Sequence, residues 1–184
     1  MVVTGLDQLI SNLNAVSRTA VPRATSQAVN RIASRAISKS VSQVSKETRV
    51  PLKLVRGRTR LKKASPNRPI ATIRVKRGNL PAINLGPVRM LISRRNSGKG
   101  GAGSVLKVGR FSFPGAFVQQ LSNGRWQVMR RTSKARYPIE VVKIPMAAPL
   151  TQAFTTQSNA LLKSDMPKEL AAALNNQLRL VIKR

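Results

Sequence analysis

The chain has 184 residues, of which 34 are Lys or Arg and 5 are Asp or Glu, so its net charge is +29. It contains no Cys and no His, which excludes disulfide bonds, thiolate metal sites and histidine acid–base catalysis. The five acidic residues are widely scattered, so no carboxylate pair or carboxylate metal cage is evident. We therefore expect a protein that is not an enzyme and that binds neither a cofactor nor a metal ion.

The same composition allows a small core but requires a partner. Apolar residues make up 41% of the chain and aromatic residues 3%, so the core is expected to consist of Val, Ile, Leu and Ala. A charge of +29 on 20.1 kDa repels itself and calls for an anionic partner or an assembly. The N-terminus shows no secretory signal, and no stretch reaches the roughly 18 apolar residues of a membrane span. We expect the protein to remain in a cytoplasm, or in an assembly built there.

The first 50 residues are predicted to form an N-terminal helical region. Apolar residues recur at helical spacing before residue 14, and Pro22 suits the first turn of a second, long helix. The apolar face of this long helix is rich in small residues and comprises Val29, Ile32, Ala33, Ala36, Ile37 and Val44. Its basic face comprises Arg31, Arg35, Lys39 and Lys46. The apolar face is expected to pack either on the sheet or on a neighbouring copy of the chain.

Residues 51–146 are predicted to form a basic, antiparallel β region. Alternating or short apolar segments bounded by Gly or Pro predict strands. These segments are residues 59–64, 70–76, 79–85, 88–93, 105–111, 116–121, 125–131 and 139–144. Asn123 and Gly124 are typical of a hairpin turn between two of them. Residues 96–104 contain four glycines and are predicted to be a flexible loop.

Residues 147–184 return to a helical pattern, with one helix from about Pro149 to Leu162 and a second that begins near Asp165. The order of elements predicts an α+β fold, with a long N-terminal helix packed on an antiparallel meandering sheet and with C-terminal helices. We expect the three regions to form one folded unit.

The positive charge is concentrated in the middle of the chain. No acidic residue occurs between Glu47 and Glu140, whereas 22 of the 34 Lys and Arg lie in that segment. The densest part supplies seven candidate contacts for DNA or another anionic partner, namely Arg49, Lys53, Arg56, Arg58, Arg60, Lys62 and Lys63. Arg31, Arg35 and Lys39 on the long helix are further candidates. A solvated basic surface is the simpler alternative, and charge alone does not distinguish DNA from an acidic protein.

The Gly-rich loop resembles a phosphate-binding loop but lacks its pattern. Gly98 and Lys99 are followed by Gly100, where a Walker motif requires Ser or Thr. We expect a mobile basic loop whose base, with Arg94, Arg95 and Lys99, shares one surface with residues 49–63. Of the aromatic residues in the middle third, Phe113 and Phe117 are expected in the core. Trp126 suits either the core or a base-stacking position.

Several segments, in order over nearly the whole chain, resemble the minor tail protein Z family of lambda-like bacteriophages. The resemblance lies in residues 19–22, 28–31, 80–81, 115–121, 123–129, 136–146, 167–170 and 181–184. The Gly-rich loop is the most divergent part.

The resemblance implies a virion protein of a long, non-contractile tail that acts in tail completion at the head-proximal end. It implies a role in head–tail joining or in holding the DNA end, and it implies no catalytic residues. The expected partners are other tail and neck proteins, further copies in a ring, and phage DNA at the basic surface. The expected location is the virion tail, and the host cytoplasm during assembly. The alternative function is sequence-independent nucleic-acid binding, ribosomal-like or architectural.

Overall fold

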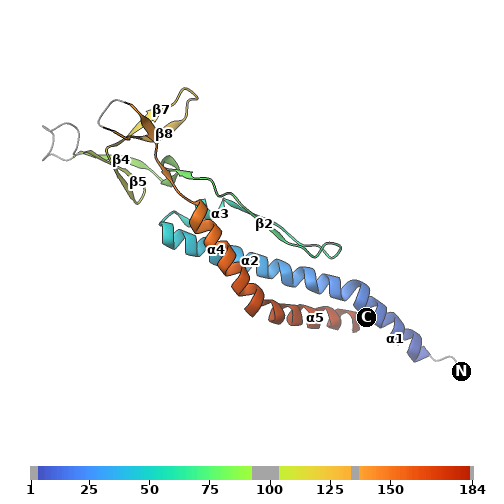
Figure 1. Ribbon diagram of the computed structural model, residues 1–184. Coiled ribbons are helices and arrows are strands. Elements are labelled where there is room, and N and C mark those ends of the chain that lie inside the picture. Colours follow the sequence, from blue (N-terminus) through green and yellow to red (C-terminus); the bar gives the residue numbers. More distant parts are fainter. Residues whose placement is uncertain (1–3, 93–103, 134–136, 183–184) are drawn as a thin grey trace.

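The computed structural model describes residues 4–92, 104–133 and 137–182. The molecule is elongated: helices form a rod, most strands gather at one end of it, and the first described helix lies at the other end (Figure 1). Helices at both ends of the sequence enclose a region of antiparallel strands, so the fold class is α+β, as predicted. No helix in the described part of the chain is both long enough and apolar enough to cross a membrane.

One continuous helix forms the N-terminal half of the rod, where the sequence predicts two. It consists of α1 (Thr4–Ala15), a π-helical turn η1 (Val16–Ala20) and α2 (Val21–Thr48). The N–H of Val21 donates to the carbonyl of Val16, one residue further back than in an α-helix. Pro22 has no N–H, and its ring disfavours the normal α-helical turn before it. The wider π turn removes that conflict and lets the helix continue.

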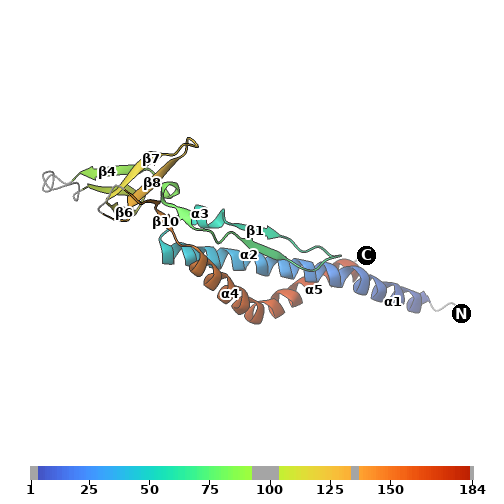
Figure 2. The same ribbon diagram turned by 45° about the horizontal axis from the view of Figure 1, so that its top comes forward.

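Two C-terminal helices, α4 (Ala147–Ser164) and α5 (Met166–Ile182), run back along α2 with a bend at Asp165 (Figures 1 and 2). Small side chains allow a close approach of α5, since Ala24 and Ala28 of α2 pack against Ala173. We call α1, η1, α2, α4 and α5 the helical body.

The strands of the described residues form four small antiparallel sheets rather than one meander. The first pairs β1 (Thr59–Lys62) with β2 (Thr72–Val75), and the second pairs β3 (Leu80–Pro81) with β10 (Lys143–Ile144). The third contains β4 (Val88–Ile92), β5 (Ser104–Val108) and β6 (Phe111–Pro114). The fourth contains β7 (Ala116–Gln120), β8 (Trp126–Arg131) and β9 (Ile139–Val141). We call β1–β2 the hairpin and β4 to β9 the β lobe.

Three predicted strands are wrong in part. Residues 79–85 give only β3 before a short 3₁₀-helix, η2 (Ala82–Leu85). Residues 105–111 are divided by a turn at Gly109, whose positive φ of 57° suits glycine. Residues 139–144 are divided at Val142, whose N–H donates to Val128 and whose carbonyl accepts from Ala82. Val142 therefore bonds to β8 of the fourth sheet and to η2, which directly follows β3 of the second sheet. The chain passes from the fourth sheet to the second at this residue.

A single main core connects the helical body with the β lobe. It contains Val41 and Val44 of α2, Val55 of α3 (Leu52–Arg56), Leu106 and Val108 of β5, Val128 of β8, and Leu150 of α4. All of these side chains are almost completely buried. The two regions are therefore packed together by apolar side chains from distant parts of the sequence.

The apolar face of α2 is buried mostly within the chain. Ile32 and Ala36 pack against Leu161 of α4, Ile37 belongs to the main core, and Ala33 is buried. Val29 is only half-buried and borders a cavity on this face.

Candidate anion-binding surface

The hairpin separates apolar from basic side chains because strand residues alternate between two faces. Leu61, Ile73 and Val75 are half-buried and pack against the main core. The opposite face is exposed and carries Arg60 and Lys62 of β1, Arg74 of β2, and Lys76 directly after β2. We call these four residues the hairpin stripe. The hairpin runs beside α2, so the stripe extends along the rod rather than at its end (Figure 2).

Two arginines of the stripe lie directly opposite each other. Arg60 and Arg74 are Cα partners in the antiparallel register of β1 and β2. Like charges in this position destabilise a sheet, and no acidic residue occurs in the sequence between Glu47 and Glu140 to compensate. None of the stripe side chains has an ion pair in the part of the chain that the structure describes. The stripe is therefore an uncompensated line of positive charge.

Two polar contacts hold the hairpin in place. Near its tip, the side-chain amide of Asn30 donates to the carbonyl of Ala64 at 2.9 Å and accepts from the N–H of Ala64 at 2.7 Å. At its base, the Arg58 guanidinium donates to the carbonyls of Lys76, Gly78 and Asn79. Partial burial lowers the pKa of Arg58, although a guanidinium remains charged at any ordinary pH. Arg58, predicted as a partner contact, is thus bonded to the backbone of its own chain.

Two of the three predicted contacts on α2, Arg31 and Arg35, are also bonded within the chain. Arg31 pairs with Glu169 of α5 at 3.2 Å. Arg35 pairs with Glu169 at 2.6 Å and with Asp165 at 3.4 Å. These ion pairs connect α2 to the bend between α4 and α5.

The remaining predicted contacts fall into two groups. Exposed side chains are those of Lys39, Arg49, Lys53, Arg56 and Lys63, besides Arg60 and Lys62 of the stripe. Arg94, Arg95, Lys99 and the Gly-rich loop lie outside the described residues, so their shared surface with residues 49–63 stays a prediction. Sequence reasoning missed Arg74 and Lys76 as contacts. The signal was present, because strand alternation over residues 70–76 places both on one face.

The aromatic residues of the β lobe fall into a packed group and an exposed group. Phe111 and Phe113 stack at 6.2 Å between ring centroids and pack against the core, and Arg131 lies over the ring of Phe117 at 5.9 Å. Trp126 is 56% exposed, so it is not a core residue. The lobe also contains a second like-charge pair, since Arg89 of β4 is the Cα partner of Lys107 of β5.

Comparison with known proteins places the chain in a family. Residues 3–184 match the model of the family described as Prophage minor tail protein Z (GPZ). The chain belongs to this family. It is 63% identical to the "Tail completion protein" of Escherichia phage N15, with both chains covered completely. It is 53% identical to the "Tail completion protein Z" of Escherichia phage lambda, again over the whole of both chains. No solved structure matches the chain.

Membership in the minor tail protein Z family confirms the resemblance seen in the sequence. Within the described residues, no group of three or more acidic side chains is placed to hold a metal ion. The guanidinium and ammonium groups of the hairpin stripe suit phosphate or carboxylate oxygens.

Proposed function

We propose that the protein is a structural component of the phage tail that acts in tail completion, at the head-proximal end of a long, non-contractile tail. Full-length identity of 63% and 53% to two tail completion proteins supports this role. The proposed location is the virion tail, and the host cytoplasm during assembly. The partners are other tail and neck proteins.

We further propose that the hairpin stripe holds the DNA end through its phosphates. The single observation that carries this proposal is the Arg60–Arg74 pair, which places two like charges together on an exposed face. Such a pair destabilises the sheet by itself and becomes favourable when an anion lies across it. Stripe residues two apart on one strand are about 6.6 Å apart, so the charges form a line rather than a point. A line of cations binds the DNA backbone without reading its sequence.

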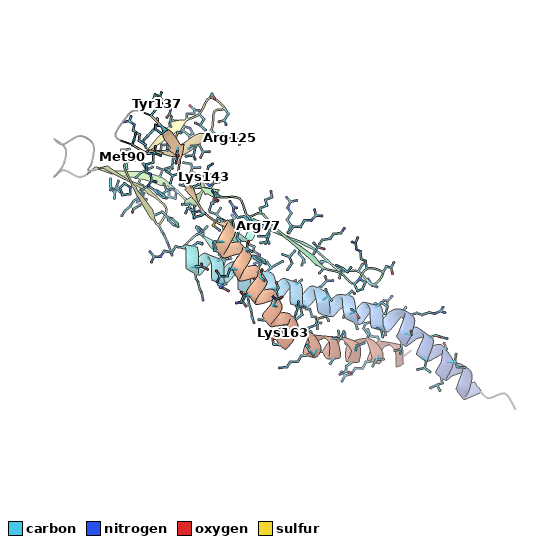
Figure 3. The ribbon with its side chains drawn as sticks, viewed as in Figure 1. Arg77, Met90, Arg125, Tyr137, Lys143 and Lys163 are labelled. Atoms are coloured by element: carbon cyan, nitrogen blue, oxygen red, sulfur yellow. The ribbon has the colours of Figure 1, made fainter. Side chains whose placement is uncertain are left out.

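The salt dependence of DNA binding tests this proposal. A variant with Arg60→Gln, Lys62→Gln and Arg74→Gln removes three stripe charges but no contact of the core. The slope of log affinity against log salt is expected to become shallower by about 2–3 units for duplex DNA. The matched control is Arg89→Gln, Lys107→Gln and Arg125→Gln, which removes three exposed charges of the β lobe, including its like-charge pair. Figure 3 shows Arg125 in the β lobe, away from the helical body. An equal change in both variants would show that only total charge matters.

The same stripe variant tests the role in the virion. We expect tails that join heads at the normal frequency but deliver DNA less well. If instead the DNA slope is unchanged and the tails fail to join heads, the stripe binds acidic protein. The alternative function, sequence-independent nucleic-acid binding, has its own test: a ribosomal-like protein freed of nucleic acid by nuclease would not remain folded as a discrete oligomer.

We also propose that copies of the chain assemble through α1. Leu9, Ile10 and Leu13 form an apolar ridge that is 49–60% exposed, and α1 extends past the rest of the helical body (Figure 1). A cavity of about 250 Å³ on the apolar face of α2 is bordered by Ile32 and by Leu162, which is itself 52% exposed.

We infer that the ridge of one copy binds in the cavity of another. The helix is continuous from α1 to α2, so Ile10 stays about 33 Å along the axis from Ile32 of its own chain. α1 contains no Lys or Arg, so it is the helix of the rod that approaches another +29 chain with the least repulsion. A contact between two different surfaces repeats from copy to copy and gives a ring when it closes.

Cysteine cross-linking tests this assembly, since the chain has no cysteine of its own. Ile10→Cys chains and Leu162→Cys chains are mixed under mild oxidation. A disulfide-linked dimer is expected in the mixture and not in either variant alone. Leu180→Cys, at an exposed position of α5, replaces Leu162→Cys as the control. Equal linkage with both partners would contradict the proposed contact.

A further inference from the structure

A second basic feature lies where the helical body meets the β lobe. It is a cavity of about 690 Å³ between the C-terminal end of α2, the start of α3, η2 and the turn from β5 to β6. Its walls combine accessible apolar side chains, namely Pro51, Leu52 and Phe111, with the cations Lys46, Arg49 and Arg110. A volume of this size falls in the range of sites that bind small ligands or short peptide segments.

The cations of this cavity have no partner in the described part of the chain. No carboxylate lines the cavity, and the side chains of Lys46, Arg49 and Arg110 make no ion pair there. The first two come from the end of α2, whereas Arg110 is more than 60 positions away in sequence. The fold thus gathers like charges around one concavity, against their mutual repulsion.

The position of Arg110 is fixed by a close backbone contact. A Cβ on Gly109 would lie 2.7 Å from the carbonyl oxygen of Leu85, and Gly109 has a φ of 57°. Only glycine allows the turn to lie this close to η2. The tip of the β5–β6 turn is therefore pressed onto η2, and this holds Arg110 at the cavity.

Arg49 occupies a position that usually belongs to glycine. It follows α2 in the left-handed conformation, with φ 58° and ψ 9°, and no other non-glycine residue described has a positive φ. A helix end of this kind favours Gly, since a side chain is strained there. A cation near a helix C-terminus also interacts favourably with the helix dipole, but Lys46 in the last turn already supplies one. The fold itself gives no reason for arginine at this position.

We propose that the cavity binds an acidic segment of a neighbouring protein, one that carries a large apolar side chain between its carboxylates. The cations would bind the carboxylates, and the apolar wall of Pro51, Leu52 and Phe111 would bind the apolar side chain. Duplex DNA fits less well, because a wide rod with phosphates on its outside cannot enter a cavity and offers nothing to the apolar wall. The protein then has two basic surfaces with different partners: the hairpin stripe for DNA and this cavity for acidic protein.

Fluorescence anisotropy with defined peptides tests the proposal on the full chain. The probe is a fluorescein-labelled peptide Glu-Phe-Glu-Leu-Glu-Phe, and its control has Gln in place of every Glu. We expect binding of the acidic peptide only. Arg49→Gly and Arg110→Gln should each weaken binding about tenfold, whereas Arg125→Gln, an exposed arginine outside the cavity, should not change it.

Arg49→Gly separates a binding role from a structural one. Glycine relieves the left-handed strain, so this variant is expected to melt at a higher temperature than the parent while it loses the peptide. A lower melting temperature with unchanged binding would overturn the proposal, as would equal binding of the Gln peptide. Displacement of the peptide by a short DNA duplex would also overturn it. Failure of the DNA-binding proposal would appear instead as an unchanged salt slope in the stripe variant. Arg49→Gly is expected to leave the salt slope of DNA binding as it is in the parent.

Discussion

The helical body and the hairpin place their arginines in opposite environments. In the body, Arg31 and Arg35 pair with Glu169 and Asp165, two of the five acidic residues of the chain. In the hairpin, Arg60 lies opposite Arg74, and no acidic residue is near in sequence. Two of the five carboxylates, Asp165 and Glu169, thus join helices through ion pairs. The hairpin is left uncompensated, which is expected of a surface whose counter-charge comes from another molecule.

The largest expected effect tests whether the two regions fold as one unit. Leu150 of α4 is completely buried in the core shared with the β lobe, so Leu150→Ala should lower the free energy of unfolding by about 2–5 kcal/mol. Native-state hydrogen exchange should show similar loss of protection in α2 and in β8.

The control on the same helix is Leu162→Ala, which removes a side chain that is 52% exposed and should have a much smaller effect. Loss of protection confined to the helices would show that the β lobe unfolds independently. The helical body and the β lobe would then be two domains rather than one folded unit.

The next largest effect is a difference in stability between variants of two neighbouring arginines. Arg58 donates to three backbone carbonyls, and Arg58→Gln is expected to lower the free energy of unfolding by about 1.5 kcal/mol. Arg60→Gln should leave stability unchanged or raise it slightly, because it removes the repulsion from Arg74. Urea denaturation of both variants gives the comparison. Equal losses would mean that Arg60 has a structural contact of its own.

The sequence predicted the elements well where the signal is local. The helical segments, the Asn123–Gly124 turn and the alternation of the hairpin all depend on neighbouring residues, and each was found near its predicted place. The divisions at Gly109 and Val142 depend on distant groups, namely the Leu85 carbonyl and the backbone of Val128 and Ala82. No local sequence pattern predicts such contacts.

The candidate site shows the same limit. Charge density identified Arg60 and Lys62 as exposed cations. It could not show that Arg31 and Arg35 are ion-paired, because their acidic partners lie 130 or more positions away in sequence. The cavity at Arg49 was also beyond prediction, since a left-handed arginine has no sequence signature. Arg74 could have been found from alternation alone.

A smaller effect on stability is expected when one charge of the like-charge pair in the hairpin is reversed. Arg74→Glu converts the like-charge pair with Arg60 into an opposite-charge pair and should stabilise the protein by about 0.2–1 kcal/mol. Arg89→Glu does the same opposite Lys107 in the β lobe and should stabilise by a similar amount. DNA affinity should fall more for Arg74→Glu than for Arg89→Glu. Thermal unfolding and DNA titration of the two variants measure both effects, and equal losses of DNA affinity would contradict a special role of the stripe.

The smallest effect concerns the compensated charges of the helical body. The Ser164 hydroxyl donates to Asp165 at 2.7 Å and holds the pKa of that carboxyl below its ordinary value, with Lys39 and Arg35 acting in the same direction. A carboxyl whose pKa is lowered by folding stabilises the protein above its unfolded pKa, near 4, and loses that contribution as pH falls through the lower folded value. Asp165→Asn should therefore melt slightly below the parent at pH 7, and the difference should shrink to zero under acid conditions. Melting curves of the two proteins between neutral and acid pH measure this. A difference that persists in acid would mean that Asp165 stabilises the bend by packing, and not by its charge.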